Sequence, residues 1–155
     1  MIATVITIFT ATPSLAATSH HTRNHDVNVL ERGLRGSPMA GTARLLEAQG
    51  RRHGVSPFFM AAVAATESSL GRVPCSSNRK NVYGLASCVN SWPVPYFETW
   101  KESISFFARF LAQRWKGHST PYSFRGYAAC SDCWARKVSY WMKSLFGVPP
   151  DTRYP

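Results

Sequence analysis

One carboxyl group is conspicuous because of its place along the chain. Glu67 lies near the end of the most apolar internal segment, residues 58–70. A helix over this segment would be buried on nearly all sides, and both burial and the helix C-terminus raise the pKa of a carboxyl group. A carboxyl that keeps its proton near neutral pH can act as a general acid. The residues alone also allow a Glu at a solvent-facing edge, or one paired with an arginine such as Arg72.

Short motifs surround and follow this carboxyl group. The pair Glu67-Ser68 ends the apolar segment, and Asn81-Val82-Tyr83-Gly84-Leu85 comes shortly after it. This combination resembles the lysozyme-like superfamily, in which a helix ending in Glu-Ser is followed by Asn-x-Phe/Tyr-Gly-Ile/Leu in the lobe across the cleft.

Two later stretches narrow the resemblance. They are Phe97-Glu98-Thr99-Trp100, which leads into a helix, and Gly126-Tyr127-Ala128, which is followed by Trp134-Ala135 and Lys137-Val138. Both resemble the autolysin-type endo-β-N-acetylglucosaminidases (mannosyl-glycoprotein endo-β-N-acetylglucosaminidase-like domains), which cut the glycan strands of peptidoglycan. The four motifs occur in the family's order, and the resemblance covers roughly residues 37–147.

The resemblance implies a role for several residues, without a cofactor or a metal ion. Glu67 would be the catalytic acid, and Tyr127 would be a cleft tyrosine that positions the reacting sugar or water. The residues implied to bind the glycan are Ser68, Asn81, Tyr83, Gly84 and Trp100. From residue type alone, Tyr127 would more usually belong to the core, and Trp92, Tyr96 and Trp100 could stack on sugars or simply pack.

A second catalytic carboxylate is hard to find in the sequence. Glycosidases commonly use two, but no acidic residue lies between Glu67 and Glu98. Three mechanisms remain open: Glu98 activates water, the acetamido group of the substrate replaces a protein carboxylate, or Glu67 is the sole acid and base and forms an anhydro sugar, as in lytic transglycosylases. The Gly126-Tyr127-Ala128 stretch favours a glucosaminidase over the transglycosylase.

Helix signals around these motifs predict a mainly α domain. Ser37-Pro38 and Ser56-Pro57 are typical helix starts, which predict helices over 39–53 and over the apolar segment. Thr99 and Glu102 have capping-box spacing, and a last helix is expected over 134–146. Residues 72–98 have no helical period, so we expect a small, mainly α-helical domain with an irregular lobe inserted after its central helix. The resemblance implies that this domain is lysozyme-like and covers 37–147, with a small irregular or β lobe and a tail over 148–155.

The four cysteines suggest disulfide bonds in an exported chain. They are Cys75, Cys88, Cys130 and Cys133. Three pairings are possible, and the simplest joins Cys75 to Cys88 and Cys130 to Cys133. A four-cysteine zinc site and a Cys-x-x-Cys redox centre are disfavoured, because only one half has tight spacing and no strand–helix alternation surrounds it.

The N-terminal region predicts export. Residues 1–17 are apolar and end in small residues, which favours a signal peptide or an N-terminal anchor, although no Lys or Arg precedes the apolar run. A buried strand or short helix is the alternative. Residues 18–36 are polar and contain His20, His21 and His25, which we interpret as a solvated linker rather than a metal site.

Length and charge limit the remaining possibilities. The chain has 155 residues, enough for one ordinary domain, and a formal net charge of +10. Such a charge attracts polyanions, including the acidic polymers of a bacterial wall. Its basic residues are scattered and form no recognised nucleic-acid motif, so we expect no nucleic-acid partner. We expect a monomeric, secreted or periplasmic protein, free or anchored, that acts on peptidoglycan; a non-catalytic cationic wall-binding module is the alternative class.

Overall fold

The computed structural model describes residues 15–73, 78–85, 96–115, 120–124 and 126–152. Within these residues the chain is helical, with turns between the helices and no strand. The prediction of a mainly α protein is therefore confirmed. The described parts of the predicted lobe consist of turns and one short helical turn, so they contain no β structure.

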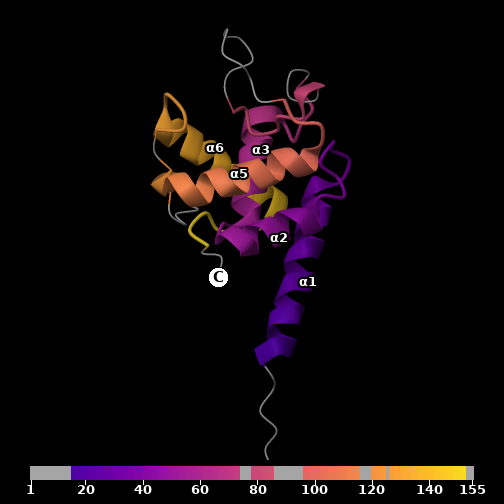
Figure 1. Cartoon of the computed structure of the whole chain (residues 1–155). Helices are drawn as coiled ribbons and strands as arrows, with labels where there is room; N and C mark the ends of the chain where they lie inside the picture. Colours follow the sequence, from indigo (N-terminus) through magenta and orange to yellow (C-terminus); the bar gives the residue numbers. More distant parts are fainter. Residues whose placement is uncertain (1–14, 74–77, 86–95, 116–119, 125, 153–155) are drawn as a thin grey trace, which may run out of the picture.

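Helix α3 (Pro57–Ser68) is the central element and forms where Ser56-Pro57 predicts it. The Ser56 hydroxyl accepts a hydrogen bond from the Phe59 backbone N–H at 3.3 Å, and Pro57 occupies the first helical position. Every residue from Pro57 to Ala65 is buried. The helix packs against α2 (Ala43–His53) and α6 (Ser131–Phe146), and it lies in the middle of the molecule in Figure 1.

Helix α2 begins four residues later than the prediction. Residues 37–41 form turns instead, in which the Ser37 hydroxyl donates to the Leu34 carbonyl and accepts from the Met39 N–H. Gly41 has a φ of +82°, a conformation that a right-handed helix does not contain. The Ser37-Pro38 signal therefore starts a turn, and the helix starts only after Gly41.

Helices α5 and α6 complete the bundle. Helix α5 (Trp100–Trp115) packs against α2 and begins as its capping signal predicts, because the Thr99 hydroxyl accepts from the Glu102 N–H at 3.2 Å. Helix α6 begins three residues earlier than predicted, since Cys130 caps it through a bond from the Cys133 N–H to its sulfur. A short 3₁₀ helix, η1 (Pro121–Ser123), contacts α6.

Helix α1 (Leu15–Leu34) replaces most of the linker predicted over 18–36. Val27, Leu30 and Leu34 lie on one stripe of α1 and are buried against the core. Arg23 reaches the buried carboxylate of Glu47 on α2, at 3.5 Å. The linker prediction was wrong, because a narrow apolar stripe is enough to dock a helix whose other faces are polar.

Figure 1 shows that the first turns of α1 extend beyond the other helices. The helix contacts both α2 and α6, so the folded unit begins before the predicted boundary at residue 37. No helix in the described part of the chain is both long and apolar enough to cross a membrane.

Candidate active site

Glu67 lies in the last turn of α3 and is partly buried. Its side chain borders an open pocket of roughly 260 Å³. The residues that line this pocket are Thr66, Glu67, Ala128, Cys130, Cys133, Trp134 and Lys137. Arg72 does not pair with Glu67, because its guanidinium group donates to the backbone carbonyls of Ser69 and Gly36. The carboxyl group is therefore accessible from solvent and is not neutralised by Arg72.

The surroundings of Glu67 favour its protonated form. Partial burial raises the pKa of the carboxyl group, and this effect exceeds two opposing ones. The opposing effects are a hydrogen bond from Trp134 and the positive charge of Lys137, both of which lower the pKa. A carboxyl with a raised pKa beside an open pocket can deliver a proton to a bound molecule.

Trp134 holds the carboxyl group in place. Its indole Nε1–H donates to Oε1 of Glu67 at 2.6 Å, and the residue is 5% exposed. The ring packs against Phe59, Phe124 and Tyr127, with ring centroids 5.1 to 6.2 Å apart. Sequence reasoning gave Trp134 no role of its own, although it occurs in the Trp-Ala-x-Lys-Val motif next to a helix start.

Gly84 is one predicted site residue that the structure brings to Glu67. A Cβ atom at this position would lie 3.0 Å from Oε2 of Glu67, and the residue has a φ of +61°. Both facts favour glycine, because a side chain would crowd the carboxylate and strain the backbone. The segment 81–85 therefore passes directly over the carboxyl group.

Three other predicted residues hold that segment in position rather than line the pocket. The Ser68 hydroxyl lies 2.7 Å from the Val82 carbonyl, to which it donates, and accepts from the Gly71 N–H. The Asn81 side chain donates to the Leu85 carbonyl and accepts from the Leu85 N–H. Tyr83 is fully buried, with its ring 3.8 Å from that of Phe107. All three side chains are buried, so the expectation that they face the glycan is corrected.

Tyr127 is partly buried and connects the two sides of the site. Its hydroxyl donates to the Tyr83 backbone carbonyl at 2.5 Å. Burial raises the pKa of this hydroxyl, and the nearby Glu67 carboxylate raises it further. Tyr127 thus lies close to the acid, but it does not line the pocket.

Trp100 and Glu98 do not line the pocket of Glu67. The Trp100 ring packs against Gly71, and the Lys80 ammonium group lies 5.0 Å from its centroid. Glu98 is exposed and is not among the residues that line the pocket, so it is not placed as a second carboxylate. Of the two aromatic residues kept as alternatives, Tyr96 is exposed, and Trp92 lies outside the described residues.

Glu67 is therefore the only carboxylate of the described pocket. The segments that the structure does not describe contain no Asp or Glu. The other seven acidic side chains of the sequence are all described, and none lines the pocket around Glu67. A second protein carboxylate is thus missing from this site as the structure describes it.

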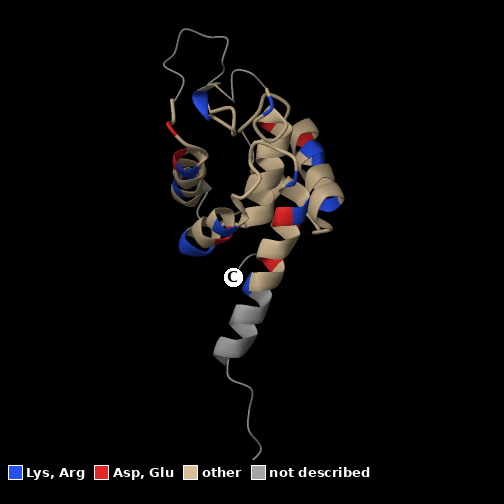
Figure 2. Cartoon of the chain, turned by 90° about the vertical axis from the view of Figure 1, so that its right-hand side faces the viewer, with Lys and Arg blue, Asp and Glu red and all other residues tan. Residues whose placement is uncertain are grey.

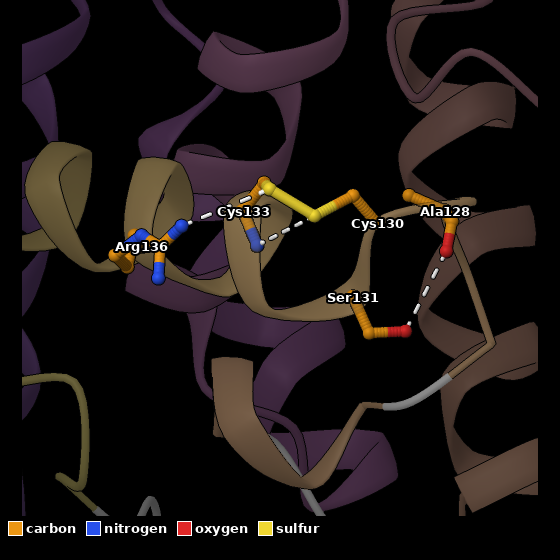
Figure 3. The surroundings of a disulfide bond; sticks show 5 residues. All are labelled: Ala128, Cys130, Ser131, Cys133 and Arg136. Carbon is orange, nitrogen blue, oxygen red and sulfur yellow. Dashed lines mark hydrogen bonds between the residues drawn. A yellow bond between two sulfur atoms is a disulfide. The ribbon is translucent and has the colours of Figure 1, made fainter.

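A disulfide bond borders the same pocket. Cys130 and Cys133 are joined, as the simplest pairing predicts, and Figure 3 shows the bond at the start of α6 beside Arg136. Cys75 and Cys88 lie outside the described residues, so their pairing stays a prediction. In the described part of the chain, no three His, Cys, Asp or Glu side chains come together in a group that could hold a metal ion.

The chain reverses sharply just after the acid. Ser69 and Leu70 have φ values of +51° and +60°, and Gly71 follows with +87°. The left-handed region is uncommon for residues with a side chain and costs roughly 1–2 kcal/mol for each. The Ser69 N–H caps α3 by donating to the Ala65 carbonyl at 3.1 Å, so this strained reversal ends the helix directly behind Glu67.

No protein-family model matches the sequence, and a search among curated proteins finds no significant match.

Proposed function

We propose that this protein cleaves β-1,4 glycosidic bonds in the glycan strands of peptidoglycan, with Glu67 as the general acid. The single observation that carries the proposal is a carboxyl group of raised pKa, oriented by Trp134, at the border of an open pocket. The resemblance of the motifs around Glu67 and Tyr127 to lysozyme-like glucosaminidases supplies the substrate class. We place the protein in that fold family as part of the same proposal.

The lone carboxylate favours a mechanism in which the substrate supplies the second group. Glu67 would donate its proton to the leaving glycosidic oxygen, while the carbonyl oxygen of the neighbouring acetamido group attacks the anomeric carbon. Water would then open this cyclic intermediate and return a proton to the Glu67 carboxylate. This scheme balances without a second protein acid, and it suits cleavage after an N-acetylglucosamine unit.

A lytic transglycosylase is the second candidate, and the same observation favours it. There the 6-hydroxyl of muramic acid attacks the anomeric carbon, and Glu67 serves as both acid and base. The non-catalytic wall-binding module, held by the +10 charge, is the candidate of another class. For each candidate we propose a monomeric protein that acts outside the cytoplasm.

Digestion of purified peptidoglycan tests the proposal. We expect Glu67→Gln to lower the rate of cleavage by about 10²–10⁴-fold, the usual contribution of a general acid. Glu98→Gln is the matched control, because Glu98 is exposed and does not line the pocket. Mass spectrometry of the products should show reducing N-acetylglucosamine ends, whereas anhydro-muramic ends would identify the transglycosylase. Equal clearing of cell walls by wild type and Glu67→Gln would overturn both enzymatic proposals.

A further inference from the structure

A second groove lies on α6 next to the pocket of Glu67. It has a volume of roughly 490 Å³ and is lined by Cys133, Arg136, Lys137, Tyr140 and Trp141. Residues spaced by three and four along a helix share one face, so these side chains form one stripe of α6. Cys133 and Lys137 line both the groove and the pocket of Glu67. A chain bound at Glu67 could therefore continue into the groove.

The lining combines an exposed tyrosine and a partly buried tryptophan with positive charges. Tyr140 is 62% exposed, and its ring lies edge-on to Trp141, with the centroids 5.1 Å apart. Aromatic rings of this kind offer an apolar face and a polar edge, which suits the faces of sugar rings. Arg136 and Lys137 add two cations, and no acidic side chain lines the groove.

Arg136 lines the groove beside Cys133, which borders both openings. Its guanidinium nitrogen Nη2 lies 3.7 Å from the sulfur of Cys133, and Figure 3 shows the side chain reaching toward that sulfur. A guanidinium group can bind a carboxylate through two parallel hydrogen bonds. Figure 2 shows Lys and Arg on several helices, so charge alone does not single out this groove; its combination with the aromatic rings and the adjoining acid does.

We propose that the α6 groove is a second subsite for the same glycan strand, in which Tyr140 stacks on a sugar and Arg136 binds a carboxylate carried by a neighbouring muramic acid unit. The carboxylate is that of the lactyl group or of the peptide attached to it. This inference rests on the proposed function of Glu67, because it uses the continuity of the groove with that pocket. We choose muramic acid as the occupant because its carboxylate complements the positive charges of Arg136 and Lys137 in the groove.

Binding is measured on the Glu67→Gln protein, so that the glycan is not consumed. Co-sedimentation with purified peptidoglycan should show that Arg136→Gln and Tyr140→Ala each weaken binding by about two- to tenfold. Arg136→Gln should also flatten the dependence of affinity on salt, whereas Tyr140→Ala should not. Arg44→Gln and Tyr122→Ala are matched controls, since both side chains are exposed and line neither opening.

The source of the negative charge is tested on the glycan. Amidation of the carboxyl groups of the peptidoglycan should reduce binding to the level of Arg136→Gln. Removal of covalently attached phosphate-containing wall polymers should leave the effect of Arg136→Gln unchanged. If that removal abolishes the effect, or if amidation has no influence, the proposed ligand is wrong.

The outcomes separate this inference from the proposed function. If the wild-type protein releases new sugar ends and both groove variants bind like their controls, the subsite is wrong and the glycosidase proposal stands. If no new sugar ends form with wild type, the glycosidase proposal fails, and the subsite fails with it. Both groove side chains are exposed, so thermal unfolding should be unchanged and loss of fold cannot imitate loss of binding.

Discussion

Trp134 of α6 donates a hydrogen bond from its indole nitrogen to the carboxyl group of Glu67 on α3, over 2.6 Å. The two residues are 67 positions apart in the sequence. The bond fixes one carboxyl oxygen, Oε1, and Gly84 approaches the other, Oε2. The orientation of the acid therefore depends on two segments that fold onto α3 from different parts of the chain.

Replacing Trp134 by phenylalanine should change the pH dependence of cleavage. The indole N–H stabilises the ionised carboxylate, so its loss should raise the pKa of Glu67 further. A general acid must be protonated, and activity is lost as pH rises through its pKa. We therefore expect the descending alkaline limb of kcat/KM to move to higher pH, with a loss of about tenfold in the maximum because the acid is no longer oriented. A limb that moves to lower pH would contradict this role for Trp134.

Lys137→Met should also move the alkaline limb of kcat/KM to higher pH, but this shift should depend on the salt concentration. The positive charge of Lys137 lowers the pKa of Glu67, so its removal raises that pKa. Lys137 is exposed, and the shift should therefore shrink as salt is added, whereas the shift in Trp134→Phe should persist. Lys143→Met is the matched control, since Lys143 is an exposed lysine of α6 that does not line the pocket. A shift of equal size in both lysine variants would contradict the prediction.

Gly84→Ala should impair both folding and cleavage. The left-handed backbone costs about 1–2 kcal/mol in the free energy of unfolding, and the new methyl group meets the Glu67 carboxylate. Gly54→Ala separates the two effects, because Gly54 has a φ of +64° with no atom within 4 Å of an added Cβ. Thermal unfolding should show a loss of stability in both variants, whereas only Gly84→Ala should lose activity. Full activity in Gly84→Ala would show that the loop does not define the site.

Glu67→Gln should make the protein more stable at neutral pH. The folded protein raises the pKa of Glu67 above its ordinary value of 4.5, so the unfolded chain ionises first as pH rises. Wild-type stability therefore falls between the unfolded pKa and the raised folded pKa, and stays lower above it. Glutamine does not titrate and can still accept the bond from Trp134. We expect a higher Tm for the variant by a few degrees at pH 7, and a difference that shrinks below pH 4.

Local signals predicted the elements that local interactions build. Helix α3 starts where a serine side chain caps it and a proline follows, and both are adjacent in sequence. Helix α1 was missed because most of its residues are polar, and only the spacing of Val27, Leu30 and Leu34 indicates a buried face. That spacing can be seen in the sequence, but these side chains become buried only because α2 and α6 pack against α1.

The site was predictable to a smaller extent. The apolar surroundings of Glu67 in sequence indicated a buried acid, and the structure places it at a pocket. The direction of the Asn81 and Tyr83 side chains was not predictable, because a polar or aromatic residue in a loop can face either the ligand or the core. The bond from Trp134 depends on how α6 packs against α3, which no local pattern encodes.

The strained reversal after α3 has a consequence for the thermal stability of this chain. Ser69 is exposed and has a left-handed backbone, so glycine there would relieve strain without removing a packed side chain. The exchange would add about 1 kcal/mol to the free energy of unfolding. A single exchange two residues from the acid would thus raise the melting temperature of the protein while leaving the side chains of the pocket in place.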